Sequence, residues 1–375
     1  MKNSILFSVL ALIILVSCGK KPDYNGALVE SAKQKFGIDT ISKDFVNPWG
    51  MAFLPDGRTL VTERRGTIRI IQDGKLLADS VAGVPEVFFE GQGGLLDIQL
   101  HPDYSTNGWI YLTYSKPGPD TTSATTLART KISGNSFVEF SEIFTAVPFE
   151  KTKHHYGSRI AFDGKGHVFI SSGERGLKEH AQDLTNYHGK IVRLNEDGSI
   201  PQDNPFLNTA GAMPGIWSYG HRNPQGLIYD SETGLLWDTE HGPKGGDELN
   251  LVKPGKNYGW PVITYGINYD DTPITDITEK EGMEQPKRYW KPSIATGGLM
   301  KVTGDRYPAW KGNLLVGALA QMHIARVELS DTTYVAEERL LEKVGRVRCV
   351  AQSPDGFLYV ATEGPGALLK LVPVQ

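Results

Sequence analysis

Short apolar stretches alternate with polar turns along most of the chain, and one hairpin pattern recurs. In "IAFDGKGHVFISSGE", which begins at Ile160, two apolar strands flank a turn built on Asp163-Gly164 and Gly166. Each copy joins an apolar strand, a turn rich in Asp, Gly or Asn, and a second apolar strand. The six copies begin at Met51, Ile98, Ile160, Leu227, Tyr307 and Val350.

Repetition of one hairpin at this interval is typical of a radial fold. A blade of four short strands needs roughly 40–50 residues, so six blades with long loops fit the 375-residue chain. The pattern predicts an all-β, six-bladed β-propeller that occupies residues 38–375 as a single domain. The strand candidate Ile38–Val46 is expected to complete the last blade. A β-sandwich and a seven-bladed ring are the alternatives, because Asp-Gly hairpins recur in all-β proteins generally.

The N-terminus departs from this pattern. An apolar run over residues 5–16 is too short to span a bilayer comfortably, but it suits the core of a signal peptide. The run ends in "LVSC", which resembles the lipobox of bacterial lipoproteins. We therefore expect a lipoprotein signal peptide over residues 1–17, a lipid on Cys18 and a tether over residues 18–37. This predicts an exported domain, on the periplasmic side or in the cell envelope, anchored to a membrane by its lipid alone. An ordinary cleaved signal is the alternative.

Charge and cysteine usage exclude several function classes. Lys and Arg number 39 against 43 Asp and Glu, a formal net charge of −4. Without a basic surplus, nucleic acid is not expected as a partner. With Cys18 lipidated, Cys349 stands alone and no disulfide framework is expected. No Cys and His residues have the spacing of a zinc site or a haem-attachment motif.

Polar residues gather at two positions of successive hairpins. One set stands just before the first strand: Asn47, Trp49, Gln92, His155, Arg222, Asn223, Arg346 and Arg348. The other set follows the second strand: Glu63, Glu174, Glu240, His241, Gly242, Pro243 and Glu363. These positions are neighbours at the open end of a hairpin, and the open ends of all blades point to one face. The sequence therefore predicts an active-site mouth at one end of the central channel.

One hairpin brings an imidazole and a carboxylate together. Folding the stretch about the Gly164–Lys165 bond places His155 across from Glu174. A carboxylate that accepts a hydrogen bond from one ring nitrogen fixes the tautomer and makes the other nitrogen a better base. The pair is therefore a candidate acid–base pair, with a surface histidine near a surface acid as the alternative.

Two further stretches suggest charged ligands. Arg346 and Arg348 stand at strand period, so both guanidinium groups share one face, where an anion with several carboxylates would relieve their repulsion. The alternative is a solvated strand edge. In "EHGPKGGDELNLVKPGKNYGWP", a Gly-Pro turn and the acids Asp247 and Glu248 offer the oxygen ligands that suit Ca²⁺. A solvated acidic loop is the alternative there.

Seven stretches together resemble the family of soluble quinoprotein glucose dehydrogenases and aldose sugar dehydrogenases. They are "NPWGMAFLPDG", "EGQGGLLDIQLHPDY", "HHYGSRI", "SYGHRNPQGL", "EHGPKGGDELN", "NYGWP" and "GRVR", and the resemblance covers about residues 40–372. Members are six-bladed propellers that bind pyrroloquinoline quinone (PQQ). The resemblance implies oxidation of an aldose to a lactone, with Ca²⁺ as a second cofactor and an external quinone or cytochrome as electron acceptor.

The resemblance also implies a role for each matching residue. The catalytic group would be His155 as general base, Glu174 as its carboxylate partner and Arg222 against the quinone carbonyl. The cofactor-binding group would be Gln92, Asn223, Arg346 and Arg348, with Tyr269 in the pocket wall over PQQ. The calcium ligands would be the backbone oxygens of Gly242 and Pro243 and, at a further site, Glu248 and Tyr258.

Two departures from the family pattern bear on function. Glu174 stands where the family usually has aspartate, so a longer reach and a looser contact with His155 are expected. Ala320 stands where the family commonly has a PQQ-contacting lysine, and one lost charge-assisted contact costs about 1.5–3 kcal/mol. A non-catalytic propeller that binds carbohydrate or a protein at the same mouth is therefore the alternative function. A metal-dependent lactonase is a third hypothesis, which requires several carboxylates around one ion.

Overall fold

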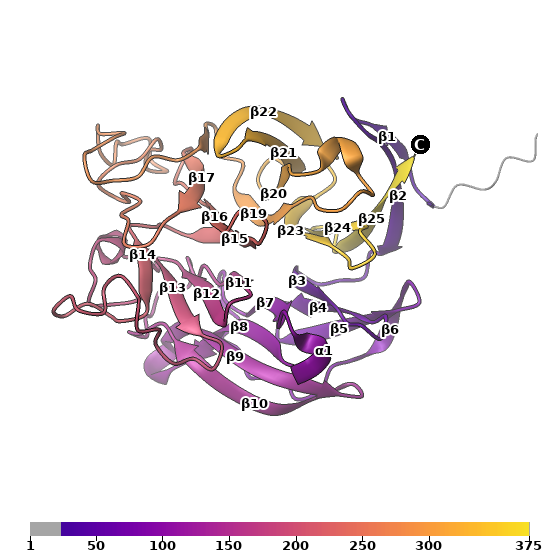
Figure 1. Cartoon of the computed structure of the whole chain (residues 1–375), viewed down its shortest axis with the longest axis horizontal. Coiled ribbons are helices and arrows are strands. Elements are labelled where there is room, and N and C mark those ends of the chain that lie inside the picture. The colour runs from indigo at the N-terminus through magenta and orange to yellow at the C-terminus, as the bar shows by residue number, and fades with distance from the viewer. Residues whose placement is uncertain (1–23, 375) are drawn as a thin grey trace, which may run out of the picture.

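Six antiparallel sheets surround a common centre in the computed structural model, which describes residues 24–374 (Figure 1). Five sheets have four strands and the sixth has five. The inner strands of successive sheets contact one another in a closed circle, β3–β7–β11–β15–β19–β23 and back to β3. The predicted all-β, six-bladed propeller is therefore confirmed. The proposed signal peptide and Cys18 lie outside the described residues.

The first three blades are simple meanders from an inner to an outer strand. Blade 1 contains β3 (Pro48–Phe53), β4 (Thr59–Glu63), β5 (Thr67–Gln72) and β6 (Lys75–Ser80). Blade 2 contains β7 (Leu95–Leu100), β8 (Ile110–Pro117), β9 (Ser123–Ser133) and β10 (Ser136–Thr145). Blade 3 contains β11 (Ile160–Phe162), β12 (His167–Ser172), β13 (Lys190–Asn195) and β14 (Ile216–Tyr219).

The remaining blades continue the ring. Blade 4 contains β15 (Pro224–Asp230), β16 (Leu235–Glu240), β17 (Asp247–Val252) and β18 (Arg288–Trp290). Blade 5 contains β19 (Thr296–Lys301), β20 (Leu314–Ala318), β21 (His323–Ser330) and β22 (Thr333–Leu340). Blade 6 contains β23 (Arg346–Gln352), β24 (Leu358–Glu363) and β25 (Ala367–Val374), followed outward by β2 (Lys35–Ser42) and β1 (Leu28–Glu30).

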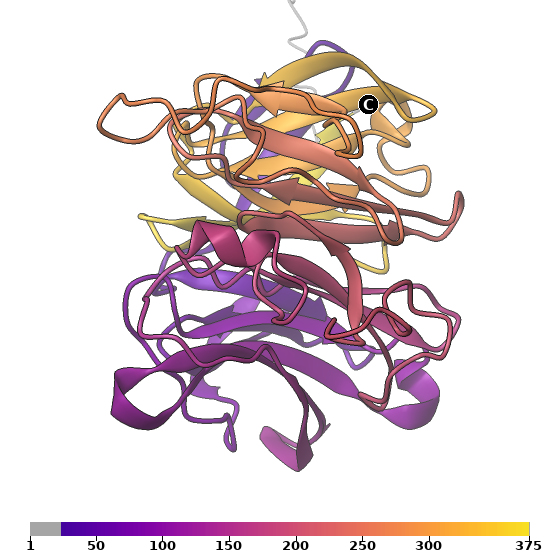
Figure 2. The ribbon, with the colours of Figure 1, turned by 90° about the vertical axis from the view of Figure 1, so that its left-hand side faces the viewer.

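Helical segments are few and short. They are α1 (Tyr104–Asn107) and the 3₁₀ turns η1 (Pro119–Thr121), η2 (Lys178–Ala181) and η3 (Pro308–Trp310). Among residues 24–374, no helix combines the length and the apolar composition needed to cross a bilayer. The long connection between β17 and β18, residues 253–287, extends away from the ring (Figure 2).

The ring is closed by strands from the two ends of the chain. Strand β2 pairs antiparallel with β25, with Lys35 opposite Val374. The expectation that the segment near Ile38 completes the last blade is therefore confirmed. The expected boundary at residue 38 is wrong, however, because β1 and the start of β2 already belong to the blade. In the sequence, residues 28–37 resemble a tether because they are short, polar and far from their partner strand β25.

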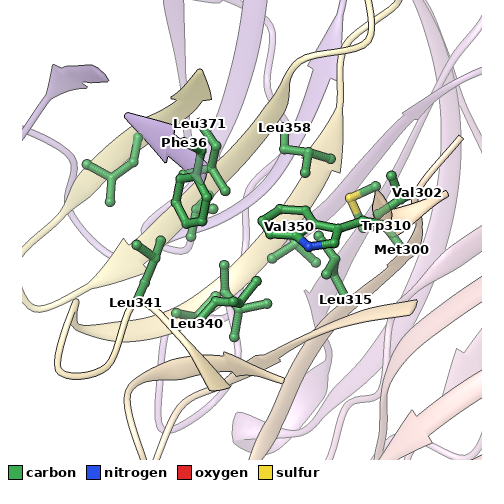
Figure 3. Packing of buried hydrophobic residues seen from close by; sticks show 14 of the residues in the cluster. Phe36, Met300, Val302, Trp310, Leu315, Leu340, Leu341, Val350, Leu358 and Leu371 are labelled. Atoms are coloured by element: carbon green, nitrogen blue, oxygen red, sulfur yellow. The ribbon is translucent and has the colours of Figure 1, made fainter. Parts of the chain in front are cut away.

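The fifth predicted hairpin was wrong in its first strand. Tyr307 does not begin a strand; it precedes η3, whose last residue, Trp310, donates its backbone N–H to the Tyr307 carbonyl at 2.9 Å. The true inner strand is β19, which pairs with β20. Trp310 is fully buried and packs edge-on against Phe36 of β2, with ring centroids 5.4 Å apart (Figure 3). The aromatic run thus fills the core between blades 5 and 6 rather than extending a sheet.

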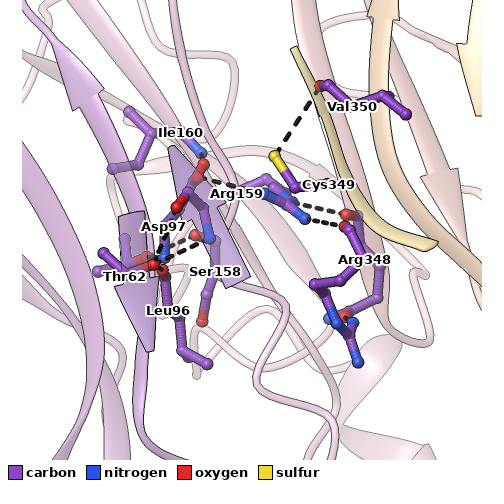
Figure 4. A network of polar contacts seen from close by, with 12 residues as sticks. Thr62, Leu96, Asp97, Ser158, Arg159, Ile160, Arg348, Cys349 and Val350 are labelled. Atoms are coloured by element: carbon purple, nitrogen blue, oxygen red, sulfur yellow. Dashed lines mark hydrogen bonds and ion pairs between the residues drawn. The ribbon is translucent and has the colours of Figure 1, made fainter. Parts of the chain in front are cut away.

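Arg159, which is 5% exposed, contacts residues of several blades. Its guanidinium pairs with Asp97 Oδ1 at 3.1 Å and donates to the carbonyls of Gln225 at 2.7 Å and Arg348 at 2.9 Å (Figure 4). It also lies over the ring of Trp49, with 3.9 Å between the guanidinium carbon and the ring centroid. These contacts join blade 3 to blades 1, 2, 4 and 6, and they form a floor beneath the channel mouth.

Candidate active site

Three adjoining cavities open where the inner strands begin. The first, the arginine cavity, has a volume of about 280 Å³ and is lined by Trp49, Arg64, Gln92, Tyr269, Arg346, Arg348 and Glu363. The second, the histidine cavity, is also about 280 Å³ and is lined by His154, His155, Glu174, Arg222, Pro243 and Tyr269. The third, the acidic cavity, is only about 10 Å³ and is lined by Arg222, Glu240, Gly242, Glu248 and Tyr258.

The cavities share walls, so they form one continuous region. Tyr269 lines the first two cavities, and Arg222 lines the second and third. Tyr269 is 74% exposed, as expected for a lid-like side chain at the rim. Most of the distant polar residues predicted to converge on one mouth therefore line these cavities, whereas Asn47, Glu63 and Asn223 do not.

His155 and Glu174 form the predicted pair. His155 Nδ1 lies 2.8 Å from Glu174 Oε2, and both side chains are almost completely buried. The longer glutamate side chain reaches the ring fully, so the expected looser contact is wrong. A carboxylate accepts from Nδ1–H, which leaves Nε2 of His155 as the unprotonated nitrogen.

The backbone around the pair is held in an unusual shape. His155 has φ of 57°, in the left-handed region that non-glycine residues seldom adopt. Its N–H donates to Gln92 Oε1 at 2.8 Å, which ties the loop to blade 2. Gly173 permits the close approach of the facing strand, because a Cβ there would lie 2.2 Å from the His155 carbonyl oxygen.

Electrostatics keep the pair in a base-plus-carboxylate state. Burial lowers the pKa of His155; the hydrogen bond that its Nδ1–H donates to Glu174 opposes this, and the charge on Arg222 lowers the pKa further. Burial alone would raise the pKa of Glu174, but the hydrogen bond and charge of His155 and the charge of Arg222 outweigh it. Its pKa therefore lies below the ordinary value, and neutral imidazole beside a carboxylate is the expected form at neutral pH.

Arg222 stands between the histidine and acidic cavities. Its Nη1 donates to the carbonyl of Gly242 at 2.8 Å, and its guanidinium lies over the Trp260 ring with 5.2 Å to the centroid. Its buried Nε finds no hydrogen-bond partner within residues 24–374. A buried donor without a partner is costly, so an acceptor from a ligand fits this position.

The arginine cavity carries an excess of positive charge. One oxygen of Glu363 accepts from Arg348 Nε at 2.9 Å and the other from Arg346 Nε at 3.3 Å. The anion expected between this pair is thus partly supplied by the protein itself. Arg64 lines the same cavity, and its buried Nε also lacks a partner in the described part of the chain. Three guanidinium groups therefore face one carboxylate.

The shifts in the pKa values of Arg64 and Glu363 reflect this excess of positive charge. Burial lowers the pKa of Arg64; Glu363 opposes this, and Arg346 lowers the pKa further. Burial would raise the pKa of Glu363, but the charges of Arg348, Arg346 and Arg64 bring it below its ordinary value. A second anion would satisfy the remaining charge.

Asn223 occupies a different place from the one its predicted role requires. It is fully buried, and its Oδ1 accepts the N–H of Gly157 at 3.1 Å. It does not line any of the three cavities. In this geometry Asn223 shapes the loop that precedes β11 rather than facing a cavity.

Glu240 and Glu248 line the acidic cavity, and two further oxygen-bearing side chains, Asp238 and Asn250, lie on the same two strands. Asp238 and Glu240 on β16 face Asn250 and Glu248 on β17, with Asp238 opposite Asn250 and Glu240 opposite Glu248. Neither oxygen of Asp238 nor the Oδ1 of Asn250 has a hydrogen-bond partner among the described residues. His221 Nδ1 lies 3.1 Å from Glu240 Oε1 and 3.3 Å from Asp238 Oδ2.

Burial and mutual repulsion raise the pKa of two of these acids. The pKa of Asp238 is raised by burial and then by the charge of Glu240, and the same two causes raise that of Glu248. Grouped buried carboxylates with unused oxygens fit a hard cation such as Ca²⁺. The Tyr258 hydroxyl is already bonded to the Leu251 carbonyl at 2.6 Å, so only the backbone carbonyl of Tyr258 is free to join such a site.

Comparison with known proteins was decisive. The chain matches the family model described as "Glucose / Sorbosone dehydrogenase" over residues 45–370. This chain belongs to the glucose/sorbosone dehydrogenase family.

Relatives of known name and structure support the assignment to the glucose/sorbosone dehydrogenase family. Aldose sugar dehydrogenase YliI of Escherichia coli is 41% identical over 350 residues, which cover 92% of this chain and 94% of the relative. The apo-form structure of soluble aldose sugar dehydrogenase from E. coli has a TM-score of 0.87 at 40% identity and covers 90% of this chain and all of that one. The PQQ-bound aldose sugar dehydrogenase from Streptomyces coelicolor has a TM-score of 0.74 at 28% identity, covering 91% and 99%.

Sequence reasoning missed several residues of this glucose/sorbosone dehydrogenase site. Arg64 was overlooked because it follows Glu63 in a charged turn that looks like solvated surface. Asp238 and Asn250 were missed beside the predicted Glu240 and Glu248, although the members of each pair, Asp238 with Glu240 and Glu248 with Asn250, are spaced two residues apart as on one face of a strand. That spacing on consecutive strands was the available signal.

Proposed function

We propose that this chain is a PQQ- and Ca²⁺-dependent dehydrogenase that oxidises aldose sugars to lactones. Family membership and the PQQ-bound relative support an oxidoreductase that uses this cofactor. The observation that carries the proposal is the buried His155–Glu174 pair in the same cavity as Arg222, whose Nε has no hydrogen-bond partner in residues 24–374. A base and an anion-stabilising donor around one space suit proton abstraction coupled to removal of a hydride.

The arginine cavity fits the acidic end of PQQ. PQQ is a planar tricarboxylic acid, and Arg64, Arg346 and Arg348 offer more positive charge than Glu363 neutralises. Bidentate guanidinium–carboxylate pairing would use this surplus. Ala320 removes the lysine that commonly contacts PQQ in the family, and Arg64 would compensate by bringing another cation to the cofactor cavity. Gln92 and Tyr269 would complete the walls, and Asn223 would act through the loop at Gly157.

The chain's own residues would perform the proton chemistry. His155 Nε2 would take the proton of the sugar's anomeric hydroxyl while Glu174 stabilises the imidazolium that forms. Bound PQQ would supply the two-electron oxidant that accepts the hydride from the same carbon. Arg222 would orient the cofactor carbonyl and stabilise its growing negative charge. The buried position of the pair excludes water from the reacting groups.

Two calcium positions are proposed. Glu248, with Glu240 and the Tyr258 carbonyl, would hold one Ca²⁺ in the acidic cavity, and the unpartnered oxygens of Asp238 and Asn250 lie on the same two strands. Gly242 and Pro243 would direct backbone oxygens to the ion that polarises PQQ. The Gly242 carbonyl now accepts from Arg222, so it would be shared between the two.

Removing charge from the acidic cavity should alter the calcium response. We expect Ca²⁺ to raise the melting temperature of the PQQ-free protein and Glu248→Gln to abolish most of that rise, because the ion loses an ionised ligand. The measurement is a thermal melt with Ca²⁺ and with chelator. The exposed acid Glu281→Gln is the matched control. An unchanged calcium shift in Glu248→Gln would remove this site from the proposal.

Removing one guanidinium from the arginine cavity should weaken cofactor binding. Arg64→Gln and Arg346→Gln are each expected to reduce PQQ affinity about ten- to hundred-fold, through loss of one charge-assisted contact. Calorimetric titration of the apo-protein with PQQ measures this without any turnover. Arg306→Gln, beside Asp355 and away from the mouth, should leave the affinity unchanged. Wild-type affinity in Arg64→Gln would show that Arg64 does not contact the cofactor.

The decisive experiment is reconstitution. Purified protein loaded with PQQ and Ca²⁺ should reduce a dye acceptor when given a panel of aldoses. No activity above a His155→Ala control would refute the enzyme and favour a non-catalytic carbohydrate- or protein-binding propeller. The lactonase hypothesis requires several carboxylates around one ion, and Glu240 and Glu248 line the acidic cavity together. Its volume of about 10 Å³ nevertheless leaves no room for a lactone.

Export and electron transfer complete the proposal. A signal peptide over residues 1–17 and a lipid on Cys18 would place the enzyme on the periplasmic side or in the cell envelope, tethered to a membrane. Electrons would leave to an external quinone or cytochrome, since the sequence has no haem-attachment motif of its own. The substrate would be a small aldose that enters the histidine cavity.

A further inference from the structure

A second group of metal-ligating side chains lies outside the channel mouth. Glu150, His180 and His188 each offer one ligand atom, and these atoms all lie within 4.8 Å of one another. The two imidazoles face each other with their Nδ1 atoms 3.1 Å apart and their rings nearly parallel, at an interplanar angle of 22°. None of the three residues lines the arginine, histidine or acidic cavity.

His188 is the unusual member of the group. It is 0% exposed, and its Nε2 has no hydrogen-bond partner within residues 24–374. Its Nδ1 lies 3.1 Å from the Nδ1 of His180, and two nitrogen lone pairs repel unless a proton or a metal ion lies between them. His180 and Glu150 are both partly exposed, so an ion can reach the group from solvent.

The chemical types of the three ligands, two imidazoles and one carboxylate, indicate which metal ion would bind. Two imidazole nitrogens and one carboxylate suit Zn²⁺, whereas Ca²⁺ and Mg²⁺ prefer oxygen ligands alone. Zn–N bonds of about 2.0–2.1 Å in a tetrahedron place two nitrogens about 3.3 Å apart, close to the separation seen here. We propose that Glu150, His180 and His188 form a Zn²⁺ site, with water as the fourth ligand. This proposal does not depend on the proposed sugar oxidation.

Two buried cations lie close to the group, and both donate mainly to backbone carbonyls. Lys190 Nζ donates to the carbonyls of His180, Ala181 and His188 at 2.6–3.2 Å. Arg175 donates to the carbonyls of Ser123, Thr152 and His154 at 2.6–3.1 Å. Their charges weaken the binding of any cation, so only an ion with strong imidazole affinity would be retained.

The Zn²⁺ site would cross-link the segments that carry the acid–base pair. Glu150 lies in the connection that leads to His155, and His180 lies in η2, six residues after Glu174. His188 precedes β13. An ion that ties these three segments together would stabilise blade 3 near the mouth. The site's role is therefore structural, and it acts on the position of the pair rather than on the sugar.

Zinc binding to the purified, PQQ-free protein tests the proposal. The protein is first treated with chelator, then given excess Ca²⁺ to occupy oxygen sites, and titrated with Zn²⁺ against a chromophoric chelator. We expect one tight zinc equivalent and a higher melting temperature in the wild type. Glu150→Gln and His180→Ala should each weaken Zn²⁺ binding about a hundred-fold or more. His167→Gln removes a partly exposed histidine elsewhere in blade 3 and should retain full binding.

Each other outcome contradicts the site. The proposed site is refuted if the wild type binds zinc no more tightly than the His180→Ala variant does. If Glu150→Gln and His180→Ala both still bind zinc but Glu248→Gln does not, the zinc lies in the acidic cavity, and the proposed site is refuted. Melting of the variants in chelator shows whether they fold. If His180→Ala is unfolded, the conservative Glu150→Gln variant decides the question, because glutamine keeps the shape but not the charge.

Discussion

Replacement of His155 by alanine is expected to lower kcat for an aldose about a hundred- to ten-thousand-fold in the protein loaded with PQQ and Ca²⁺. The imidazole is nearly buried, its Nδ1 is held 2.8 Å from Glu174, and its Nε2 is the free basic nitrogen of the histidine cavity. Without it, no other neutral imidazole is oriented by a carboxylate in this cavity. Steady-state kinetics with saturating sugar and acceptor measure the loss.

Two matched variants separate a chemical role from a structural one. His154 lines the same cavity but has no such carboxylate contact, so His154→Ala should change kcat by less than about tenfold. Glu174→Gln should lower kcat because the amide no longer stabilises the imidazolium. Full activity in His155→Ala with PQQ bound would exclude His155 as the base.

The pH profile gives a second signature of the same pair. His155 must be neutral to act, so kcat/KM should fall as the pH drops through its pKa, which burial places below the usual value. Glu174 raises that pKa through its hydrogen bond, and Arg222 and His154 lower it through their charges. Glu174→Gln should therefore move the acidic limb to lower pH, whereas loss of the Arg222 charge should move it to higher pH. A purely structural effect would leave the limb unmoved.

Loss of the central ion pair is the second large effect. Asp97→Ala is expected to lower the free energy of unfolding by about 3–5 kcal/mol, because it leaves the Arg159 guanidinium buried without its counter-charge. Asp97 is 1% and Arg159 5% exposed, and Asp97 Oδ2 also accepts the N–H of Ile160 at 3.0 Å. Chemical denaturation of wild type and variant gives the difference.

The comparison with milder variants sharpens this test. Burial raises the pKa of Asp97 more than Arg159 lowers it, so ionising this carboxyl is itself costly within the fold. Asp97→Asn should therefore be less harmful than Asp97→Ala, since it keeps the shape and part of the hydrogen bonding. Lys311→Ala breaks a fully exposed pair with Asp305 and should leave the midpoint unchanged. A small effect in Asp97→Ala would show that water reaches Arg159.

The fold was largely predictable because its signals are local. Turn chemistry around Asp163-Gly164 and the two-residue period of the strands specify each hairpin, and six copies specify the ring. The same local register predicted the His155–Glu174 contact across a single hairpin. The Tyr307–Trp310 stretch misled because aromatic residues suit both a strand and a buried turn, and only its packing on Phe36 distinguishes the two.

What escaped prediction depends on contacts between blades. Arg64 belongs to blade 1 but faces Arg346 and Arg348 of blade 6, and no spacing within one hairpin reveals this. Glu363 was expected at the mouth, but its spacing did not reveal that it bridges both arginines. Glu150 and His188 come from different connections around blade 3, so their approach to His180 follows from tertiary packing alone.

The pairing of β2 with β25 means that the ring closes only late in the synthesis of the domain. It joins residues 35–42 to residues 368–374, so one half is among the first parts of the domain to leave the ribosome and the other among the last. Until the C-terminal strand is released, the nascent chain is an open arc with an unpaired sheet edge at each end. Contacts of such long sequence separation form slowly. A variant that lacks β25 is therefore expected to leave β2 without its partner strand and the ring open.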